Sequence, residues 1–411
     1  MFKKISVEHL RLGMYIHALC SPWLSHPFWC DSFLLTSPHD LKNLRTCETE
    51  VWIDTSRGLD VRENIHHVVY VTTTNEPLAT HTLEAISGKT PLALELQRAA
   101  ALCQQAHAAV VDMFHEARMG LAINTHRASQ LVQEITCSVA RNPNALISVA
   151  RLKTADTYTY MHSVAVSALM VALARRLGLS DTWVEQAGMA GLLHDIGKAH
   201  TRTEILNKPG ALTHEEFVHI QQHPVDAYQL LQNSGLPKRI LDAVLHHHER
   251  LDGRGYPDRL AGGDIQRMAR MTAICDIYDA VTSNRPYKQG WDPAIALQRM
   301  ADWCGEHLDR RLFEAFVKTV GIYPIGSLVR LESNLLGLVC EPSGNSMFTP
   351  RIVCFYDISS KQLLNPPTLI DLAQVTDDRI VAREDPAHWP FTNMDALWQK
   401  AMQSTEESAT A

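Results

Sequence analysis

Seven histidine and aspartate side chains have the types and spacing of a metal site. They are His162, His194, Asp195, His223, His247, His248 and Asp276. A catalytic zinc ion takes about three protein ligands plus a water molecule, so seven donors are more than one ion needs. We therefore expect two divalent ions that share a carboxylate. Paired ions about 3.5–4 Å apart are a recurring apparatus for displacement at phosphorus.

The first motif is His194-Asp195-Ile196-Gly197-Lys198. An aspartate can bridge two ions because it offers one oxygen to each, which is the role we expect for Asp195. On a helix, Lys198 would share a face with His194 and Asp195, since they lie four and three residues before it. Its ammonium would then lie beside the metals, against a phosphate oxygen or a leaving group. We predict that Asp195 and Lys198 are catalytic.

Two further motifs carry the other donors. His247 and His248 are expected to end a helix, and the glycines and proline that follow them predict a tight loop. In that loop Tyr256 offers a face for stacking. Asp276 and Asp279 lie three residues apart on another expected helix. After it come two cations that could hold phosphate oxygens, and we predict substrate contacts from Tyr256, Asp279, Arg285 and Lys288.

Each of these features alone has an ordinary structural explanation. His162 on an apolar helix is more often a satisfied core histidine, and His223-Pro224 is consistent with a helix end. Arg285 and Lys288 alone would be a solvated surface. The complete series of spacings favours the metal site over these ordinary explanations, because the whole series is improbable by chance.

Hydrophobic patterning predicts a mainly α protein with small β parts at both ends. Short apolar runs predict a β-rich N-terminal domain over residues 1–75, followed by a linker and connecting helix over 76–125. Helical periodicity then marks an all-helical domain over 126–322 that carries every metal donor. Apolar runs resume in a C-terminal β-containing appendage over 323–402, and 403–411 is expected to be a disordered tail.

Composition limits the class of partner. The net charge of −7 argues against binding to polymeric nucleic acid, which needs a basic footprint. Nine cysteines without a Cys-x-x-Cys pair indicate reduced thiols rather than a disulfide framework. No run reaches the roughly 18 apolar residues of a membrane span, and the N-terminus lacks the apolar stretch of a signal peptide. We expect a soluble, cytoplasmic protein.

The motifs resemble those of the HD-GYP family, a branch of the HD metal-dependent phosphohydrolases. The resemblance covers about residues 150–320 and rests on HDIGK at 194–198, KPGALT at 208–213, HP at 223–224, HHERLDGRGYP at 247–257, DIYDA at 276–280 and RPYK at 285–288. Residues 1–75 are similar to a domain of unknown function that precedes many HD-GYP domains.

The resemblance implies a fold, an activity and roles for single residues. The domain should be an HD-type helical phosphohydrolase that hydrolyses cyclic di-GMP to linear pGpG and on to GMP, by attack of a hydroxide bridging two metals. The seven donors match the family's ligands, and Lys198 matches its lysine near the scissile phosphate. Tyr256, Arg285 and Lys288 match positions that hold the cyclic dinucleotide. Other signalling proteins, such as diguanylate cyclases, are possible partners, and the chain could form a dimer.

Two positions depart from the family pattern. Some members have a third metal and a glutamate one turn before the first histidine; here Tyr158 stands there, so we predict two metals. Arg202-Thr203 replaces the usual Pro-Asp and changes the wall of the site. The nitrogen and oxygen donors favour Fe, Mn, Ni, Co or Zn over Mg. Two alternatives stay open: a weakly catalytic cyclic di-GMP sensor, or a phosphohydrolase for another nucleotide such as cyclic GMP-AMP.

Overall fold

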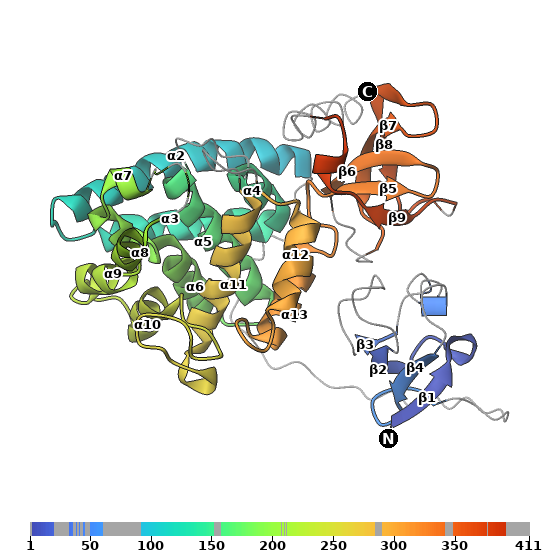
Figure 1. Cartoon of the computed structure of the whole chain (residues 1–411), viewed down its shortest axis with the longest axis horizontal. Helices are drawn as coiled ribbons and strands as arrows, with labels where there is room; N and C mark the ends of the chain where they lie inside the picture. The colour runs from blue at the N-terminus through green and yellow to red at the C-terminus, as the bar shows by residue number, and fades with distance from the viewer. Residues whose placement is uncertain are drawn as a thin grey trace, which may run out of the picture. The chain divides into compact units, whose positions relative to one another are not determined.

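The structure is a computed structural model, and it describes residues 2–19, 33–35, 38, 41, 44–45, 50–60, 92–151, 158–206, 208, 210, 212–283, 290–341, 348–375 and 377–391. The chain divides into two compact units, Met1–Lys89 and Thr90–Ala411 (Figure 1). The expected tail at 403–411 and the expected linker at 76–90 lie outside the described residues.

The first unit contains an antiparallel sheet whose strands follow the order β1-β4-β2-β3. Their bounds are β1 (Phe2–Ser6), β2 (Tyr15–Leu19), β3 (Phe33–Leu34) and β4 (Glu50–Asp54). Val51 and Ile53 are buried while Trp52 between them is 40% exposed, which is the alternation of a strand with one face on a core. The predicted β-rich character of the N-terminal domain is therefore confirmed over its described part.

The second unit begins with the helices expected from the periodicity. They are α2 (Leu92–Arg118), α3 (Thr125–Arg141), α4 (Pro143–Arg151), α5 (Tyr158–Arg176), α6 (Asp181–Leu193), α7 (Thr203–Leu206), α8 (His214–Ile220), α9 (His223–Leu231), α10 (Lys238–His246), α11 (Arg267–Thr282), α12 (Pro293–Asp302) and α13 (Arg310–Val320). Short 3-10 turns, η3 (Ile196–His200) and η4 (Gly262–Asp264), interrupt them. Within the described ranges, none of these helices combines the length and apolarity needed to cross a lipid bilayer.

Helix α5 is the centre of this unit. Every residue from Met161 to Ala174 is buried, and α5 packs against α6, α2, α4 and α11 (Figure 1). A helix that is apolar on all sides belongs in a core, which explains the near-continuous run of Val, Ala, Leu and Met in its sequence. The core position of α5 fixes His162 at the base of the site.

Helix α2 is fastened to α3 by a buried ion pair. Glu95 is fully buried, and its two carboxylate oxygens accept hydrogen bonds from Arg141 at 2.8 Å each. Ser138 donates a further bond to the same carboxylate at 3.0 Å. Helix α2 lies in the segment predicted as linker and connecting helix, yet it packs along α3, α4 and α5 as part of the helical unit. The predicted domain boundaries stay predictions.

A second antiparallel sheet follows the helices, in the order β8-β7-β6-β5-β9. Its strands are β5 (Leu328–Leu331), β6 (Leu335–Glu341), β7 (Arg351–Asp357), β8 (Gln362–Asp371) and β9 (Ile380–Arg383). Apolar runs at 327–329, 338–340 and 352–356 predict β5, β6 and β7, but no such run predicts β9 or β8, which contains Pro366 and Pro367. Proline lacks the N–H that a central strand requires, and β8 tolerates it because it lies at the edge of the sheet.

Candidate metal centre

Three of the seven donors stand where helices end. His194 and His247 directly follow α6 and α10, and His223, the first residue of α9, lies three residues after the end of α8. The last carbonyl groups of a helix lack partners inside the helix, and in each case the histidine ring donates Nδ1–H to the carbonyl oxygen three residues earlier. The pairs are His194 with Gly191 at 2.8 Å, His223 with Ile220 at 2.7 Å and His247 with Val244 at 2.8 Å.

These bonds fix the tautomer of all three rings. A carbonyl oxygen only accepts, so Nδ1 carries the hydrogen and Nε2 presents a lone pair. The Nε2 atoms of His223 and His247 then face each other at 3.2 Å. The buried atoms His194 Nε2 and Asp195 Oδ1 have no hydrogen-bond partner in the described part of the chain. Lone pairs directed at one another need a cation between them, so the donor set fits bound metal ions.

The structure corrects the expected path of the first motif. Helix α6 ends at Leu193, and Asp195 caps the 3-10 turn η3 instead of continuing the helix. The turn brings Gly197 against the start of α9, where a Cβ atom would lie 2.0 Å from the carbonyl oxygen of His223, so only glycine fits there. In a 3-10 turn, side chains three apart are eclipsed, and Lys198 Nζ lies 2.5 Å from Asp195 Oδ2. The expected contact between these two side chains is therefore present, but a 3-10 turn rather than an α-helix positions them.

His162 is held between two aspartates of α11. Its Nε2 lies 2.9 Å from Asp276 Oδ1, and its Nδ1 lies 2.6 Å from Asp279 Oδ2. Asp279 is only 3% exposed and is turned to the rear of His162. The substrate contact that the sequence predicted for Asp279 stays a prediction. The geometry suits a carboxylate that orients the ring.

Asp195 lies between two groups of donors. The first group is His162, His194 and Asp276, and the second is His223, His247 and His248; within each group the nearest ligand atoms lie within 4.8 Å of one another. Asp195 Oδ2 lies 3.4 Å from His194 Nε2, on the first group's side. Asp195 Oδ1 lies 3.2 Å from His223 Nε2, on the second group's side. One carboxylate thus offers one oxygen to each group.

The electrostatics of the centre favour a protonated His194 and keep the other shifted histidine rings neutral. Burial opposes a charge on His194, but Asp195 and Asp276 outweigh it and raise its pKa to about 10. Burial lowers the pKa of His223 and His247, and it lowers the pKa of His248 to about 3. Burial also opposes charge on Asp195, yet His194 and Lys198 hold its pKa well below the usual range. Metals bind neutral imidazoles and ionised carboxylates, so His194, whose protonated form the two aspartates favour, would lose its Nε2 proton when a metal ion takes its place.

One side of the centre is open. The side chains of Lys198 and His248 are 22% and 23% exposed, whereas those of the other predicted ligands are 9% exposed or less. Tyr256 lies on this open side, with its ring 4.8 Å from the His248 ring and tilted by 32°. The predicted contacts Arg285 and Lys288 lie outside the described residues.

The fold of the loop 249–260 depends on a buried acidic residue, Glu249, which the sequence analysis did not single out. Glu249 is 3% exposed, and its carboxylate accepts a hydrogen bond from the backbone N–H of Asp258 at 2.7 Å. Gly255 lies so close to the start of the loop that a Cβ atom would be 2.5 Å from the Cα of Glu249. The pair folds the loop back and places Tyr256 beside His248. A single glutamate in a polar loop carries no sequence signal for burial.

Comparison with known proteins agrees with these features. Residues 135–312 match a family model described as HD domain, and residues 2–128 match a domain of unknown function, DUF3391. The chain is 51% identical to the cyclic di-GMP phosphodiesterase PA4108 of Pseudomonas aeruginosa, over 98% of this chain and 97% of that protein. The chain belongs to the HD-GYP family. Its DUF3391 match extends past the predicted boundary at residue 75 and includes helix α2.

Other curated relatives match a smaller share of this chain. The cyclic di-GMP phosphodiesterase response regulator RpfG of Xanthomonas campestris pv. campestris is 40% identical over 36% of this chain and 39% of its own length. The 3'3'-cGAMP-specific phosphodiesterase 1 of Vibrio cholerae is 38% identical over 39% of this chain and 38% of its own length.

Proposed function

We propose that this HD-GYP protein is a metal-dependent phosphodiesterase that hydrolyses cyclic di-GMP to pGpG and then to GMP. One observation carries the proposal: Asp195 directs one oxygen to each of two buried donor groups. Such a carboxylate suits a pair of ions that share one ligand. The near full-length similarity to a cyclic di-GMP phosphodiesterase supports the choice of substrate.

The first ion would be held by His162, His194 and Asp276, and the second by His223, His247 and His248, with Asp195 shared. Imidazole-rich sites with two carboxylates suit Fe, Mn, Ni, Co or Zn, and Mg prefers oxygen donors alone. When bound, such a pair supplies Lewis acidity, lowers the pKa of water toward 7 and stabilises charge that develops at phosphorus. The family pattern at Tyr158 supports two ions rather than three.

Further residues would bind and orient the substrate. Lys198 is anchored on Asp195 and partly exposed, so its ammonium is placed to stabilise a phosphate oxygen or the leaving 3′ oxygen. Tyr256 offers a ring face beside His248 for a guanine base. Arg285 and Lys288 would hold the second phosphate, as the family motif suggests. Asp279 orients His162.

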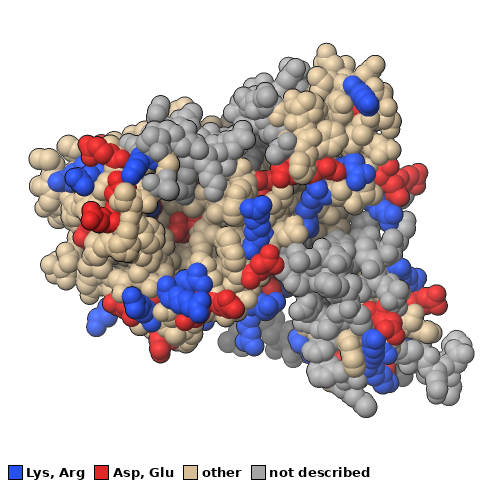
Figure 2. Space-filling view, viewed as in Figure 1, with Lys and Arg blue, Asp and Glu red and all other residues tan. Residues whose placement is uncertain are grey.

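The partner is a small cyclic dinucleotide rather than a nucleic-acid polymer. On the face shown in Figure 2, lysine and arginine side chains are interspersed with aspartates and glutamates over the described surface. Together with the net charge of −7, this does not provide the basic footprint that a phosphate backbone needs. Contacts with diguanylate cyclases, a dimeric state and a cytoplasmic location stay predictions.

Cyclic GMP-AMP is a second candidate substrate, because the similar Vibrio cholerae protein is specific for it. Both substrates present the same phosphodiester to the centre and differ in one base. The test is incubation of Mn- or Fe-loaded protein with each cyclic dinucleotide, followed by chromatography of the products. We expect pGpG and GMP from cyclic di-GMP at the higher kcat/KM. Tight binding without product would instead identify a sensor.

Asp195→Ala tests the shared carboxylate. Because this side chain faces both donor groups, the variant should lose at least one bound ion per chain and about a thousandfold or more in turnover. Asp181→Ala, at the other end of α6, is the control and should keep both. Metal analysis of the purified proteins alongside the product assay gives the answer. Near wild-type hydrolysis by Asp195→Ala would exclude the assigned role.

A further inference from the structure

A buried aspartate joins the C-terminal sheet to helix α12. Asp292 is 8% exposed and caps α12, since its Oδ1 accepts from the backbone N–H groups of Ala294 and Ile295 at 2.8 and 3.2 Å. Its other oxygen, Oδ2, accepts from the backbone N–H of Leu328, the first residue of β5, at 3.0 Å. One carboxylate therefore satisfies a helix N-terminus and a strand at once. Hydrogen bonds to an ionised acceptor are stronger than neutral ones.

The other end of α12 supports the loop beside the metal centre. After α12 the chain turns through Trp303 to Leu308, and two carbonyl oxygens of this turn receive hydrogen bonds from the loop 249–260. Asp252 N–H donates to Glu306 at 2.7 Å, and Leu251 N–H donates to His307 at 3.3 Å. The same loop places Tyr256 against His248. Helix α12 is thus a strut between β5 and the open side of the centre.

The start of α12 also fixes one end of the segment that carries Arg285 and Lys288. That segment, 284–289, lies outside the described residues, but the residues after it are tightly placed. Trp291 N–H donates to the carbonyl oxygen of Val281 at 2.8 Å, and a Cβ atom on Gly290 would lie 2.3 Å from the carbonyl oxygen of Thr282. Asp292 follows directly. Its bond to β5 therefore lies next to the described residues 290–291, at the start of the helix whose other end supports the loop 249–260.

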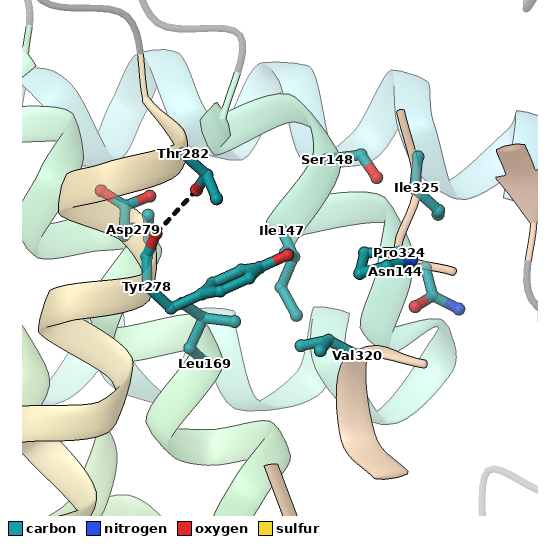
Figure 3. A pocket seen from close by; sticks show the side chains of 11 residues that line it. Asn144, Ile147, Ser148, Leu169, Tyr278, Asp279, Thr282, Val320, Pro324 and Ile325 are labelled. Atoms are coloured by element: carbon teal, nitrogen blue, oxygen red, sulfur yellow. Dashed lines mark hydrogen bonds between the residues drawn. The ribbon is translucent and has the colours of Figure 1, made fainter. Parts of the chain in front are cut away.

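A more direct path from the sheet to the centre is packed less closely. The connection between α13 and β5 contributes Pro324 and Ile325 to a cavity of about 30 Å³. Figure 3 shows the Tyr278 ring of α11 extending into this cavity toward Ile147, with Asp279 and Thr282 beside it. A void removes van der Waals partners from the side chains that line it. The other connection runs through hydrogen bonds, from β5 to Asp292 and from the turn after α12 to the loop 249–260.

We propose that Asp292 is a positioning residue, through which the C-terminal sheet holds the loop 249–260 in its substrate-binding arrangement. This inference rests on the proposed function. The predicted metal ligands lie on α5, α9 and α11 and directly after α6 and α10, whereas the strut leads to the loop. Breaking the Asp292–Leu328 bond should therefore weaken substrate binding and leave the metals in place.

Two substitutions break this bond while keeping the helix cap. Asp292→Asn retains an acceptor for Ala294 and Ile295 but turns an amide N–H₂ toward the Leu328 N–H. Asp292→Ser retains a capping hydroxyl and is too short to reach β5 at the same time. Asp378→Asn is the matched control: its carboxylate also accepts from a backbone N–H, that of Ser333, in the same sheet, at a turn.

Hydrogen–deuterium exchange of the metal-loaded full chain measures the loop directly. We expect faster exchange over 249–260 in both Asp292 variants and no change in the control. Steady-state kinetics should show a KM for cyclic di-GMP raised about fivefold, the effect of roughly one net hydrogen bond. kcat and metal content should stay near wild type.

Unchanged exchange in the loop, an unchanged KM, or a loss of turnover that only follows loss of metal would overturn the inference. If the asparagine variant does not fold, the serine variant decides. Exchange requires no turnover, so a wild-type chain that does not hydrolyse cyclic di-GMP would contradict the proposed function alone. The exchange result would still decide the role of Asp292.

Discussion

His194, His223 and His247 each owe their tautomer to a helix end. The carbonyl oxygen three residues earlier takes the Nδ1 hydrogen of each ring, and all three Nε2 lone pairs are left for the centre. Donors fixed in this way lose little side-chain freedom on binding a metal, because their rings are already oriented. His162 differs, since a carboxylate rather than a carbonyl oxygen receives its Nδ1 hydrogen.

Asp279→Ala tests this orientation. Without the acceptor at 2.6 Å, the His162 ring can rotate, so we expect metal affinity to fall about 10- to 100-fold, the usual cost of losing such a partner. Competition with a chelator measures the change. Asp242→Ala removes the same kind of contact from His246, which is not a predicted ligand, and should leave affinity unchanged. Equal affinities for the two variants would contradict the assigned role of Asp279.

The residue types and spacing predicted which donors come together. They did not predict that Asp279 supports the His162 ring. Asp276 and Asp279 lie three apart on α11 and share a face, so both reach His162, one at each ring nitrogen. Their sequence separation alone does not distinguish a ligand from its support. That difference depends on how α5 packs on α11, a long-range contact.

At the scale of elements, the residues at helix ends decide which parts of the fold could be predicted from the sequence. The α-helical ranges were predictable, because Asn124 caps α3 and Gly178 follows α5 with a positive φ of 66°. The 3-10 turn η3 was not predictable, because the close approach of Gly197 to His223 is a long-range contact that no local pattern indicates. Strand β8 was missed for a similar reason, since its two prolines are acceptable only at a sheet edge.

The loop 249–260 depends on a glycine. In Gly255→Ala the added Cβ atom would meet backbone atoms of Glu249 and Arg250 at 2.5 Å, so the loop must open and move Tyr256. We expect KM to rise about tenfold or more, measured by steady-state hydrolysis of cyclic di-GMP. Gly263→Ala is the control, because nothing lies within 4 Å of its added Cβ atom. Similar kinetics for both variants would show that the loop does not position the substrate.

The α2–α3 ion pair gives stability that depends on pH. Burial opposes charge on Glu95, but hydrogen bonds from Arg141 and Ser138 outweigh it and lower the pKa below its usual 4.5. A lowered pKa in the folded state means that the stabilisation is present above pH 4.5 and is lost as pH falls through the folded-state pKa.

Glu95→Gln should therefore reduce the free energy of unfolding by about 2 kcal/mol at pH 7. The difference from wild type should shrink as the pH falls below 4.5. Urea unfolding across this pH range measures it, with the exposed Glu134→Gln on α3 as control. A difference that grows toward low pH would contradict the assignment.

At the scale of the whole molecule, sequence similarity to the P. aeruginosa phosphodiesterase extends through both units and the C-terminal sheet. The other curated relatives compared match 39% and 36% of this chain. The metal donors and the open side all belong to the helical domain. The sheet reaches it through Asp292 and α12, which gives the C-terminal part a role that the motifs alone did not suggest.

The central claim is a pair of ions that share Asp195 and act on a cyclic dinucleotide. Its most direct test is a titration of metal-free protein with Mn²⁺ under anaerobic conditions, with hydrolysis of cyclic di-GMP followed at each addition. We predict that the rate saturates at two equivalents of metal per chain and that pGpG is formed. Saturation at one equivalent, or full activity without added metal, would contradict the account.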